Sequence, residues 1–184
     1  IPTFVLGVGL GGLIILNLLE KTELPIEGIL LFSPMLELKR DYKGRKNKLI
    51  SNVGKISKDT RFKVGITPQD LTRNDEIIEE TANDGLMLKK VTYSWYNLIN
   101  EKMKETMDHI RDIKPISALI MYGTNDKILE TQSINEMKDK LKSKEMYFKV
   151  WDGLYHEIHN EPERDLVMRY VLSFLNNSVN TMGF

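Results

Sequence analysis

Near its start the sequence reads Thr3-Phe-Val-Leu-Gly-Val-Gly-Leu-Gly-Gly12, and this stretch decides how the fold is interpreted. An apolar run from Phe4 to Leu6 ends at a glycine, and beyond the glycine cluster the residues from Leu13 to Leu19 are mostly apolar over a helical length. Apolar runs separated by clustered glycines are typical of a strand, a tight turn and a helix. The stretch therefore predicts a strand-turn-helix unit.

Two turn designs fit these glycines. Gly7-x-Gly9-x-x-Gly12 matches the dinucleotide-binding fingerprint, in which glycines let the backbone approach a pyrophosphate at a helix N-terminus. Gly7-Val-Gly9-Leu-Gly11 matches a nucleophile elbow, G-x-S-x-G, with glycine at the serine position. An elbow holds its central residue at positive φ and needs small residues where the helix crosses close to the strand, a requirement that Gly7 and Gly11 meet.

Composition limits the possible functions. The 184 residues are 41% hydrophobic, enough for one sizeable core. Lys+Arg and Asp+Glu both total 26, so the net charge is zero and we expect no nucleic-acid partner. The absence of cysteine excludes disulfides, thiolate zinc sites and a cysteine nucleophile.

The apolar runs are short and the chain begins abruptly. No apolar run approaches the roughly 20 residues that span a bilayer, so we expect a soluble, cytoplasmic protein. Ile1-Pro-Thr3 includes no initiator Met, leads directly into a strand and does not resemble a signal region, so we expect that an upstream segment is missing.

Strand and helix patterns alternate in the first and last parts of the chain. Three further strands and two helices are predicted at Glu27–Phe32, Ser117–Tyr122, Gln132–Lys142, Met146–Trp151 and Glu163–Leu175. Strands separated by helices of this length indicate an α/β fold with a doubly wound, mostly parallel sheet.

The middle of the chain has a different pattern, charged and helical. We therefore expect residues 1–34 and 113–184 to form the core and residues 35–112 to form an inserted helical cap. The basic segment Lys39–Lys48 is expected to be a solvated loop, with a membrane-surface role as the alternative. Apolar residues recur at helical spacing and are expected to face the core, or secondarily to line a lipid pocket: Met87, Val91, Trp95, Leu98 or Ile99, Met103 and Met107.

Two candidate catalytic residues follow predicted strands. Asp126 lies in Gly123-Thr-Asn-Asp-Lys-Ile and His156 in Gly153-Leu-Tyr-His-Glu-Ile-His159. Open α/β sheets carry their sites at the carboxyl ends of the strands. With the Gly9 turn, these residues follow the chain order nucleophile, acid, histidine. The carboxylate would fix the imidazole tautomer and leave the other ring nitrogen to take a proton.

Other polar residues fit structural roles better. His159 follows His156 by three residues and not four, so the pair does not match a His-Glu-x-x-His zinc motif, and neither metal nor cofactor is expected. We expect His109 at the cap surface and interpret Ser33 as a turn residue before proline. A dinucleotide site would need an acidic residue at the end of the second strand, but Glu27 lies at its start, which disfavours nucleotide binding.

The sequence resembles the monoacylglycerol lipase and lysophospholipase group of the α/β-hydrolase superfamily over nearly all its length. The strand-elbow segment of that group normally reads G-H-S-M-G-G, which Pro2–Gly12 resembles. Leu71-Thr-Arg-Asn-Asp75 with Asn83-Asp-Gly-Leu86 is similar to its cap motif, although Gly85 replaces the usual proline. Tyr122–Lys127 and Gly153–His159 are similar to the segments that carry its catalytic aspartate and histidine.

The resemblance implies acyl-ester hydrolysis through an acyl-serine, with Asp126 and His156 as acid and histidine. Gly9 stands at the serine position and Val8 at the preceding histidine position. Of the two usual oxyanion donors only the Leu10 N–H is expected, because the other comes from a His-Gly loop upstream of Ile1. Several N-terminal strands of the family fold are expected to be missing, which would leave the edge of the Phe4 strand bare unless another segment or chain covers it.

We therefore expect a lipase relative that is inactive because it lacks the nucleophile, with a lipid or acyl ester as its ligand. The alternative is a non-catalytic lipid-binding or scaffolding protein, with membrane contact through the cap. A residual hydrolase that uses water activated by His156 is a third hypothesis. Because Val8 departs together with Gly9, natural divergence is favoured over an engineered change.

Overall fold

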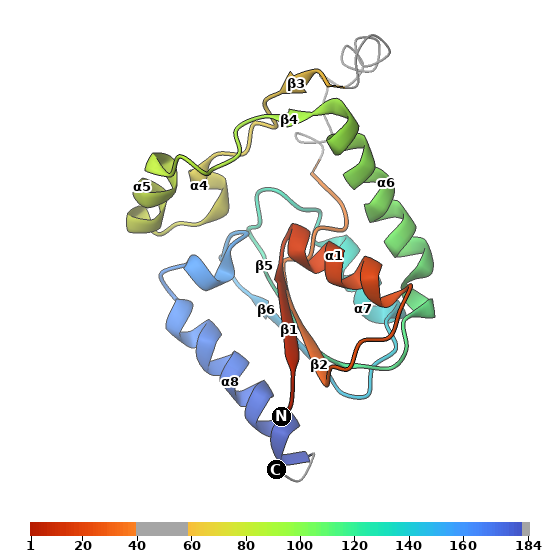
Figure 1. The fold of residues 1–184 in the computed structure, drawn as a ribbon. Coiled ribbons are helices and arrows are strands. Elements are labelled where there is room, and N and C mark those ends of the chain that lie inside the picture. The colour runs from red at the N-terminus through yellow and green to blue at the C-terminus, as the bar shows by residue number, and fades with distance from the viewer. Residues whose placement is uncertain (40–58, 182–184) are drawn as a thin grey trace.

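The computed structural model of the chain describes residues 1–39 and 59–181. At its centre lies a sheet of four parallel strands in the order β1-β2-β5-β6 (Figure 1). These strands are β1 (Phe4–Val8), β2 (Gly28–Phe32), β5 (Ser117–Gly123) and β6 (Met146–Trp151). Val8 pairs with Phe32, which pairs in turn with Met121, so the carboxyl ends of β1, β2 and β5 lie at one edge of the sheet.

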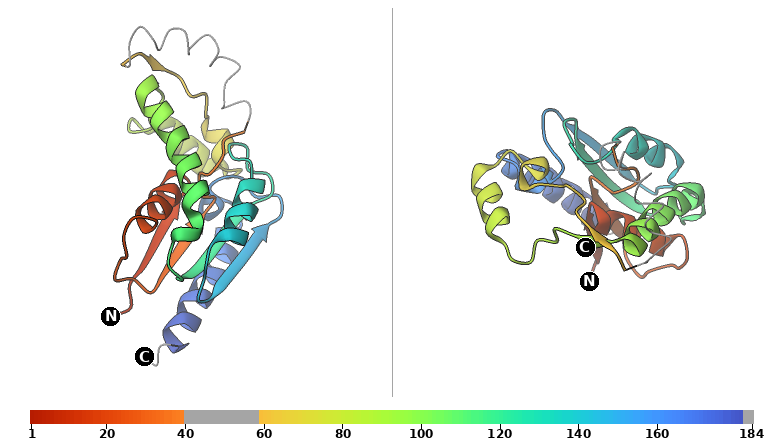
Figure 2. Two further views of the ribbon diagram at one scale, coloured as in Figure 1. Left: turned by 90° about the vertical axis from the view of Figure 1, so that its right-hand side faces the viewer. Right: turned by 90° about the horizontal axis from the view of Figure 1, so that it is seen from above.

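Helices cover both faces of this sheet, which confirms the predicted doubly wound α/β fold (Figures 1 and 2). α1 (Leu10–Leu19) and α7 (Gln132–Lys140) lie on one face, and α8 (Arg164–Thr181) lies on the other. α1 connects β1 to β2, α7 connects β5 to β6, and α8 follows β6. No helix in the described ranges is long and apolar enough to cross a membrane.

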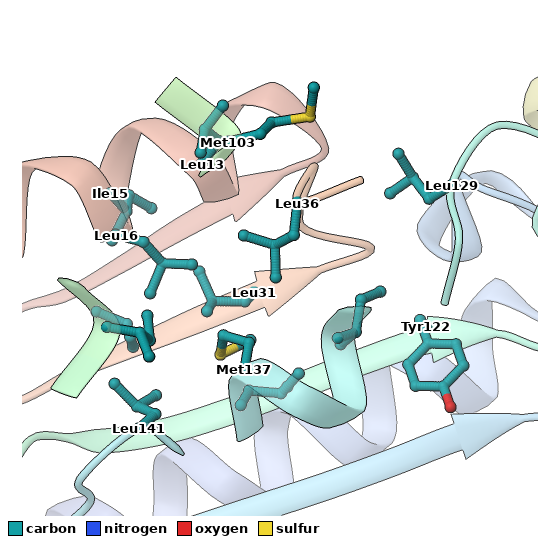
Figure 3. Close-up of a cluster of buried hydrophobic side chains, with 14 of the residues drawn as sticks. Leu13, Ile15, Leu16, Leu31, Leu36, Met103, Tyr122, Leu129, Met137 and Leu141 are labelled. Carbon is teal, nitrogen blue, oxygen red and sulfur yellow. The ribbon is translucent and has the colours of Figure 1, made fainter. Parts of the chain in front are cut away.

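The core follows from side-chain alternation along β2 and β5, which are buried over their whole length. Leu31 packs with α1 and α7, whereas its neighbour Phe32 packs with α8 on the opposite face. Figure 3 shows Leu31 between Leu16 of α1 and Met137 of α7. The loops that follow the central strands β2 and β5 therefore start from fully buried strand ends.

The long helix α6 (Tyr93–His109) packs along α1 and continues into the 3₁₀ turn η1 (Ile110–Asp112). Thr92 caps its start, because the Thr92 Oγ1 accepts a hydrogen bond from the Trp95 N–H at 3.2 Å. The predicted apolar stripe is correct in part. Met103 is buried and Ile99 and Met107 pack against the core, but Met87 and Val91 precede the helix and Trp95 is exposed.

A small antiparallel ribbon explains that difference. β3 (Arg61–Phe62) pairs with β4 (Val91–Thr92), so Val91 is buried as a strand residue and not as a helix residue. The same part of the chain contains the short helices α4 (Pro68–Leu71) and α5 (Asp75–Asn83). Apart from Lys39, the basic segment Lys39–Lys48 lies outside the described residues.

Candidate active site

The turn between β1 and α1 has the backbone conformation expected of a nucleophile elbow. Gly9 has φ 50° and ψ −113°, a region that side chains with a Cβ adopt only under strain. Its N–H donates to the Phe32 carbonyl at 3.0 Å, and its carbonyl accepts from the Met35 N–H at 2.9 Å. The end of β2 therefore fixes the elbow from both sides.

Close approach of helix and strand requires two of the flanking glycines. A Cβ on Gly7 would lie 2.6 Å from the Gly12 nitrogen, and a Cβ on Gly12 would lie 2.8 Å from the Pro34 Cβ. The prediction for Gly7 agrees with this geometry, but that for Gly11 is wrong. A Cβ on Gly11 would meet no other described atom within 4 Å, so Gly12 is the glycine that the packing needs.

Asp126 is fully buried at the end of β5, and its carboxylate is held from two directions. Its Oδ1 accepts hydrogen bonds from the Ile128 N–H at 2.8 Å and the Leu129 N–H at 2.9 Å. Its Oδ2 lies 2.8 Å from the Nδ1 of His156. The Lys39 ammonium donates to the Asp126 carbonyl, which brings a cation beside this loop.

His156 reaches Asp126 from the loop after β6, and its ring is buried. Because Nδ1 faces the carboxylate, the neutral ring carries its proton there and leaves Nε2 as an acceptor. Nε2 lies 2.9 Å from the position that a Cβ on Gly9 would take. The three residues predicted from separate strand ends therefore come together in space.

The Leu10 N–H lies directly after the elbow. Leu10 is the first residue of α1, so its N–H has no acceptor within the helix. The partial positive charge of a helix N-terminus favours anions at this place. This is the place at which the sequence predicts an oxyanion donor.

His159 and Ser33 lie near this site, but their side chains make no hydrogen bond in the described part of the chain. The His159 Nδ1 is buried without a partner there, and its ring centroid lies 6.1 Å from that of Phe32. Burial is the main cause that lowers the pKa of His159, with a smaller lowering effect from His156 and an opposing effect from Glu157. The described residues contain no group of three or more His, Cys, Asp or Glu that could hold a metal.

Among the described residues, Ser33 is the one non-glycine residue with positive φ, at 42°, and it is fully buried. Its N–H donates to the Met121 carbonyl at 2.8 Å, while its hydroxyl has no partner among the described residues. Ser33 therefore lies in a turn, as predicted, but its side chain is enclosed and does not cap that turn.

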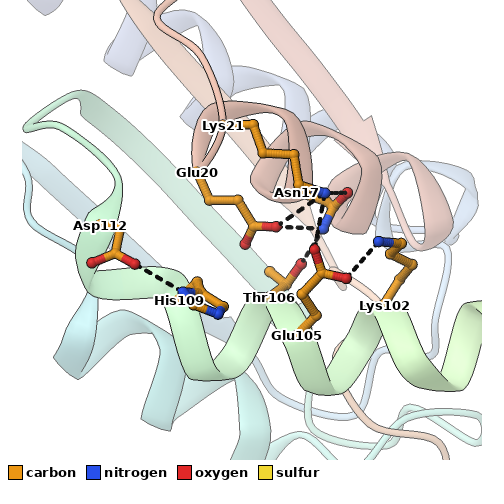
Figure 4. Close-up of polar contacts among 8 residues, drawn as sticks. All are labelled: Asn17, Glu20, Lys21, Lys102, Glu105, Thr106, His109 and Asp112. Carbon is orange, nitrogen blue, oxygen red and sulfur yellow. Dashed lines mark hydrogen bonds and ion pairs between the residues drawn. The ribbon is translucent and has the colours of Figure 1, made fainter.

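His109 lies on α6, away from the site, and its exposed side chain agrees with the surface prediction (Figure 4). Its Nδ1 lies 2.9 Å from the Asp112 Oδ2, and this hydrogen bond is the main cause that raises the pKa of His109.

Arg73 and Glu161 support the His156 loop and were not predicted from the sequence. The Arg73 Nε lies 2.6 Å from one Glu161 oxygen, and the other oxygen accepts from the Tyr155 N–H at 3.1 Å. For Arg73 the sequence signal was its place in Leu71–Asp75, which resembles a family motif, whereas Glu161 lies beyond the segment Gly153–His159.

Solved structures share the fold of this chain, which is the α/β-hydrolase fold. The monoacylglycerol lipase of Paleococcus ferrophilus superposes with a TM-score of 0.84 at 22% identity, over 96% of this chain and 69% of that one. A soluble variant of the Saccharomyces cerevisiae monoglyceride lipase, in complex with a substrate analogue, superposes with a TM-score of 0.83 at 19% identity, over 97% and 62%.

A family comparison is more specific. Residues 1–163 match the Hydrolase_4 family, described as serine aminopeptidase, S33, and the chain belongs to this family. Phospholipase YtpA of Bacillus subtilis is 28% identical over 180 residues, which cover 97% of this chain and 70% of that protein. The chain is thus a lipase- and esterase-like α/β-hydrolase relative.

Proposed function

We propose that this chain derives from an acyl-ester hydrolase whose nucleophile position, Gly9, has been vacated, and that it does not hydrolyse esters as it stands. The observation that carries the proposal is the direction of His156. Its Nε2 points at residue 9, where a hydroxyl would be activated, and glycine offers none.

In the parent chemistry each residue would have one role. Asp126 would hold the imidazole tautomer, His156 would take the proton from a serine hydroxyl at residue 9, and the Leu10 N–H would stabilise the oxyanion. Without the hydroxyl no acyl-enzyme forms. Loss of a triad nucleophile lowers turnover by about 10⁶ in a studied serine protease, so activity should fall to background.

The proposed ligand class is a lipid acyl ester. One relative is named a phospholipase, and the yeast lipase structure contains a substrate analogue. We further propose residues 35–112 as the cap that meets the acyl chain or a membrane surface. The cap contains a cavity of about 420 Å³, within the range of small-molecule sites. Apolar and basic residues line it, among them Ile66, Pro68, Met87, Lys63 and Lys89.

The decisive test restores the nucleophile. Gly9→Ser should hydrolyse a short-chain p-nitrophenyl ester above background, and Gly9→Ala, which adds a Cβ without a hydroxyl, is the matched control. The double variant Gly9→Ser, His156→Ala should lose the gain. Background hydrolysis by a folded Gly9→Ser protein would show that Asp126 and His156 no longer support acyl transfer.

A second candidate function is lipid binding without turnover, which the apolar cap cavity favours. A fluorescent fatty acid should then bind the unmodified chain with no product formed. If the unmodified chain instead hydrolyses an ester and His156→Ala abolishes this activity, water activated by His156 is the nucleophile and the proposed inactivity is wrong.

The edge of β1 is the proposed surface for self-association. Within the described residues β1 pairs only with β2, and the apolar side chains of Leu6 on β1 and of Ile14 and Leu18 on the following helix α1 are exposed. An unpaired strand edge next to apolar surface favours association with a second chain. Sedimentation velocity should detect a dimer that Leu6→Lys dissociates, and a concentration-independent monomer would contradict the proposal.

A further inference from the structure

Glu161 has the burial of a core residue although it is a carboxylate. Its side chain is completely enclosed beyond the 3₁₀ turn η2 (Ile158–Asn160). One carboxylate oxygen accepts from the Tyr155 N–H at 3.1 Å and the Arg73 N–H at 3.2 Å. The other oxygen accepts from the Arg73 Nε at 2.6 Å. A buried charge is tolerated only when it is paired and hydrogen-bonded in this way.

The same two segments are joined at two further points. The Glu157 N–H donates to the Leu71 carbonyl at 2.8 Å, and the buried Thr72 hydroxyl donates to the Asn160 carbonyl at 3.0 Å. Residues 71–73 therefore bond to the loop at three positions after His156, namely Glu157, Asn160 and Glu161. These contacts join residues up to 88 positions apart in the sequence.

His156 lies between the two anchored N–H groups. The residue before it, Tyr155, donates to Glu161, and the residue after it, Glu157, donates to Leu71. Both backbone neighbours of the histidine are thus tied to one network, while its ring is tied to Asp126. A displacement of the segment at residues 71–73 would move the backbone that carries the ring.

We infer that Arg73 and Glu161 are positioning residues that hold the His156 turn and couple the segment at residues 71–73 to the His156–Asp126 contact. Resting on the proposed function, the proposed cap would thus control the orientation of the His156 imidazole. Its test uses no turnover, so its failure and the failure of the proposed hydrolase origin are distinguishable.

The test follows the proton between His156 Nδ1 and Asp126 by proton NMR of the full chain. Its signal is assigned by its loss in His156→Gln. Arg73→Met and Glu161→Ala should speed its exchange with water about tenfold, the change expected for loss of one hydrogen bond to a charged group. Glu161→Gln keeps an acceptor for the Tyr155 N–H and should have a smaller effect.

Two controls separate positioning from general stability. Glu163 also binds the Arg73 guanidinium, at 2.6 Å, but it is partly exposed and does not accept the hydrogen bond of the Tyr155 N–H. Glu163→Gln should therefore leave the Nδ1 proton signal unchanged. Amide exchange in β5 should stay unchanged in Arg73→Met, because a merely structural defect would raise it too. If Glu161→Ala does not fold, Arg73→Met carries the test, since its side chain is partly exposed. An unchanged Nδ1 signal in folded Arg73→Met, or an equal change in Glu163→Gln, would overturn the inference.

Discussion

The His156 Nε2 lies 2.9 Å from the point at which a Cβ on Gly9 would stand, closer than real Cβ atoms approach such neighbours. The imidazole has therefore occupied part of the space that a side chain at residue 9 would need. This relationship connects the geometry of the elbow to its chemistry, because any nucleophile placed there must first displace the ring by a few tenths of an ångström.

The first prediction is a stability cost for any side chain at residue 9. Gly9→Ala should lower the free energy of unfolding by about 1–3 kcal/mol, since it combines positive φ with the close contact to His156. Urea denaturation measures the change. Gly11→Ala, in open space within α1, should instead stabilise the protein by about 0.5–1 kcal/mol. Equal effects of the two changes would contradict the elbow interpretation.

A second prediction concerns the aspartate in the nucleophile-restored protein. In the Gly9→Ser background, Asp126→Asn should lower ester hydrolysis by up to about 10⁴, because the amide no longer fixes the imidazole tautomer. Initial rates on the same p-nitrophenyl ester measure it. Asp152→Asn, a change to an exposed residue bonded to Thr124, is the matched control and should leave the rate unchanged. If Asp126→Asn leaves the rate of ester hydrolysis unchanged, Asp126 has no part in the proposed catalysis.

The sequence was sufficient to predict the central sheet because three of its strands are short apolar runs and the fourth, Met146–Trp151, has an alternating pattern. The predicted Glu27–Phe32 and Met146–Trp151 correspond to β2 and β6 with at most small shifts. α7 ends at Lys140, before the predicted Lys142, and α8 continues to Thr181, beyond the predicted Leu175. Helix ends are weakly specified by propensity, and the asparagines after Leu175 are poor helix formers that hid the continuation.

The candidate site was partly predictable for a different reason. Asp126 and His156 follow strands, and parallel strands bring their carboxyl ends together, so position along the chain implied proximity. Arg73 and Glu161 lie 88 residues apart and follow no strand, so no periodicity or spacing pointed to their contact. The ribbon β3–β4 was missed because each strand has only two residues, too few for an alternating pattern.

A third prediction follows from the partly buried His159. Burial lowers the pKa of His159 in the folded protein, so the unfolded chain binds the proton more readily. As pH falls below the ordinary value of about 6.5, stability should therefore decrease, by at most about 1.4 kcal/mol per pH unit for one group. His159→Gln should flatten the dependence of the urea midpoint on pH between 5 and 7.

His109 supplies the control for that measurement. Its pKa is raised by the Asp112 hydrogen bond, so its contribution has the opposite sign and is lost as pH rises. Because the side chain is exposed, His109→Gln should change the midpoint little. If His159→Gln leaves the pH dependence of the wild-type protein intact, the burial of His159 does not govern it.

The last prediction separates buried from exposed polar contacts between α1 and α6 (Figure 4). The Asn17 amide donates to the Glu20 Oε1 at 2.5 Å and to the buried Thr106 hydroxyl at 3.2 Å. Glu20 is itself almost completely buried, and its second oxygen has no partner in the described part of the chain. Asn17→Ala should therefore cost about 1–3 kcal/mol, because it removes the amide that donates to two buried oxygens, those of Glu20 and Thr106.

The neighbouring ion pair should matter much less. Glu105 bonds to Lys102 and Lys21, and these hydrogen bonds lower its pKa to about 2, so it stays ionised at any ordinary pH. Exposed ion pairs contribute only about 0–1 kcal/mol to stability. Lys102→Met should therefore change the unfolding midpoint little, and at high salt this small change should disappear. If Lys102→Met costs as much as Asn17→Ala in the same urea titrations, the two helices are held by surface charge and not by the buried amide.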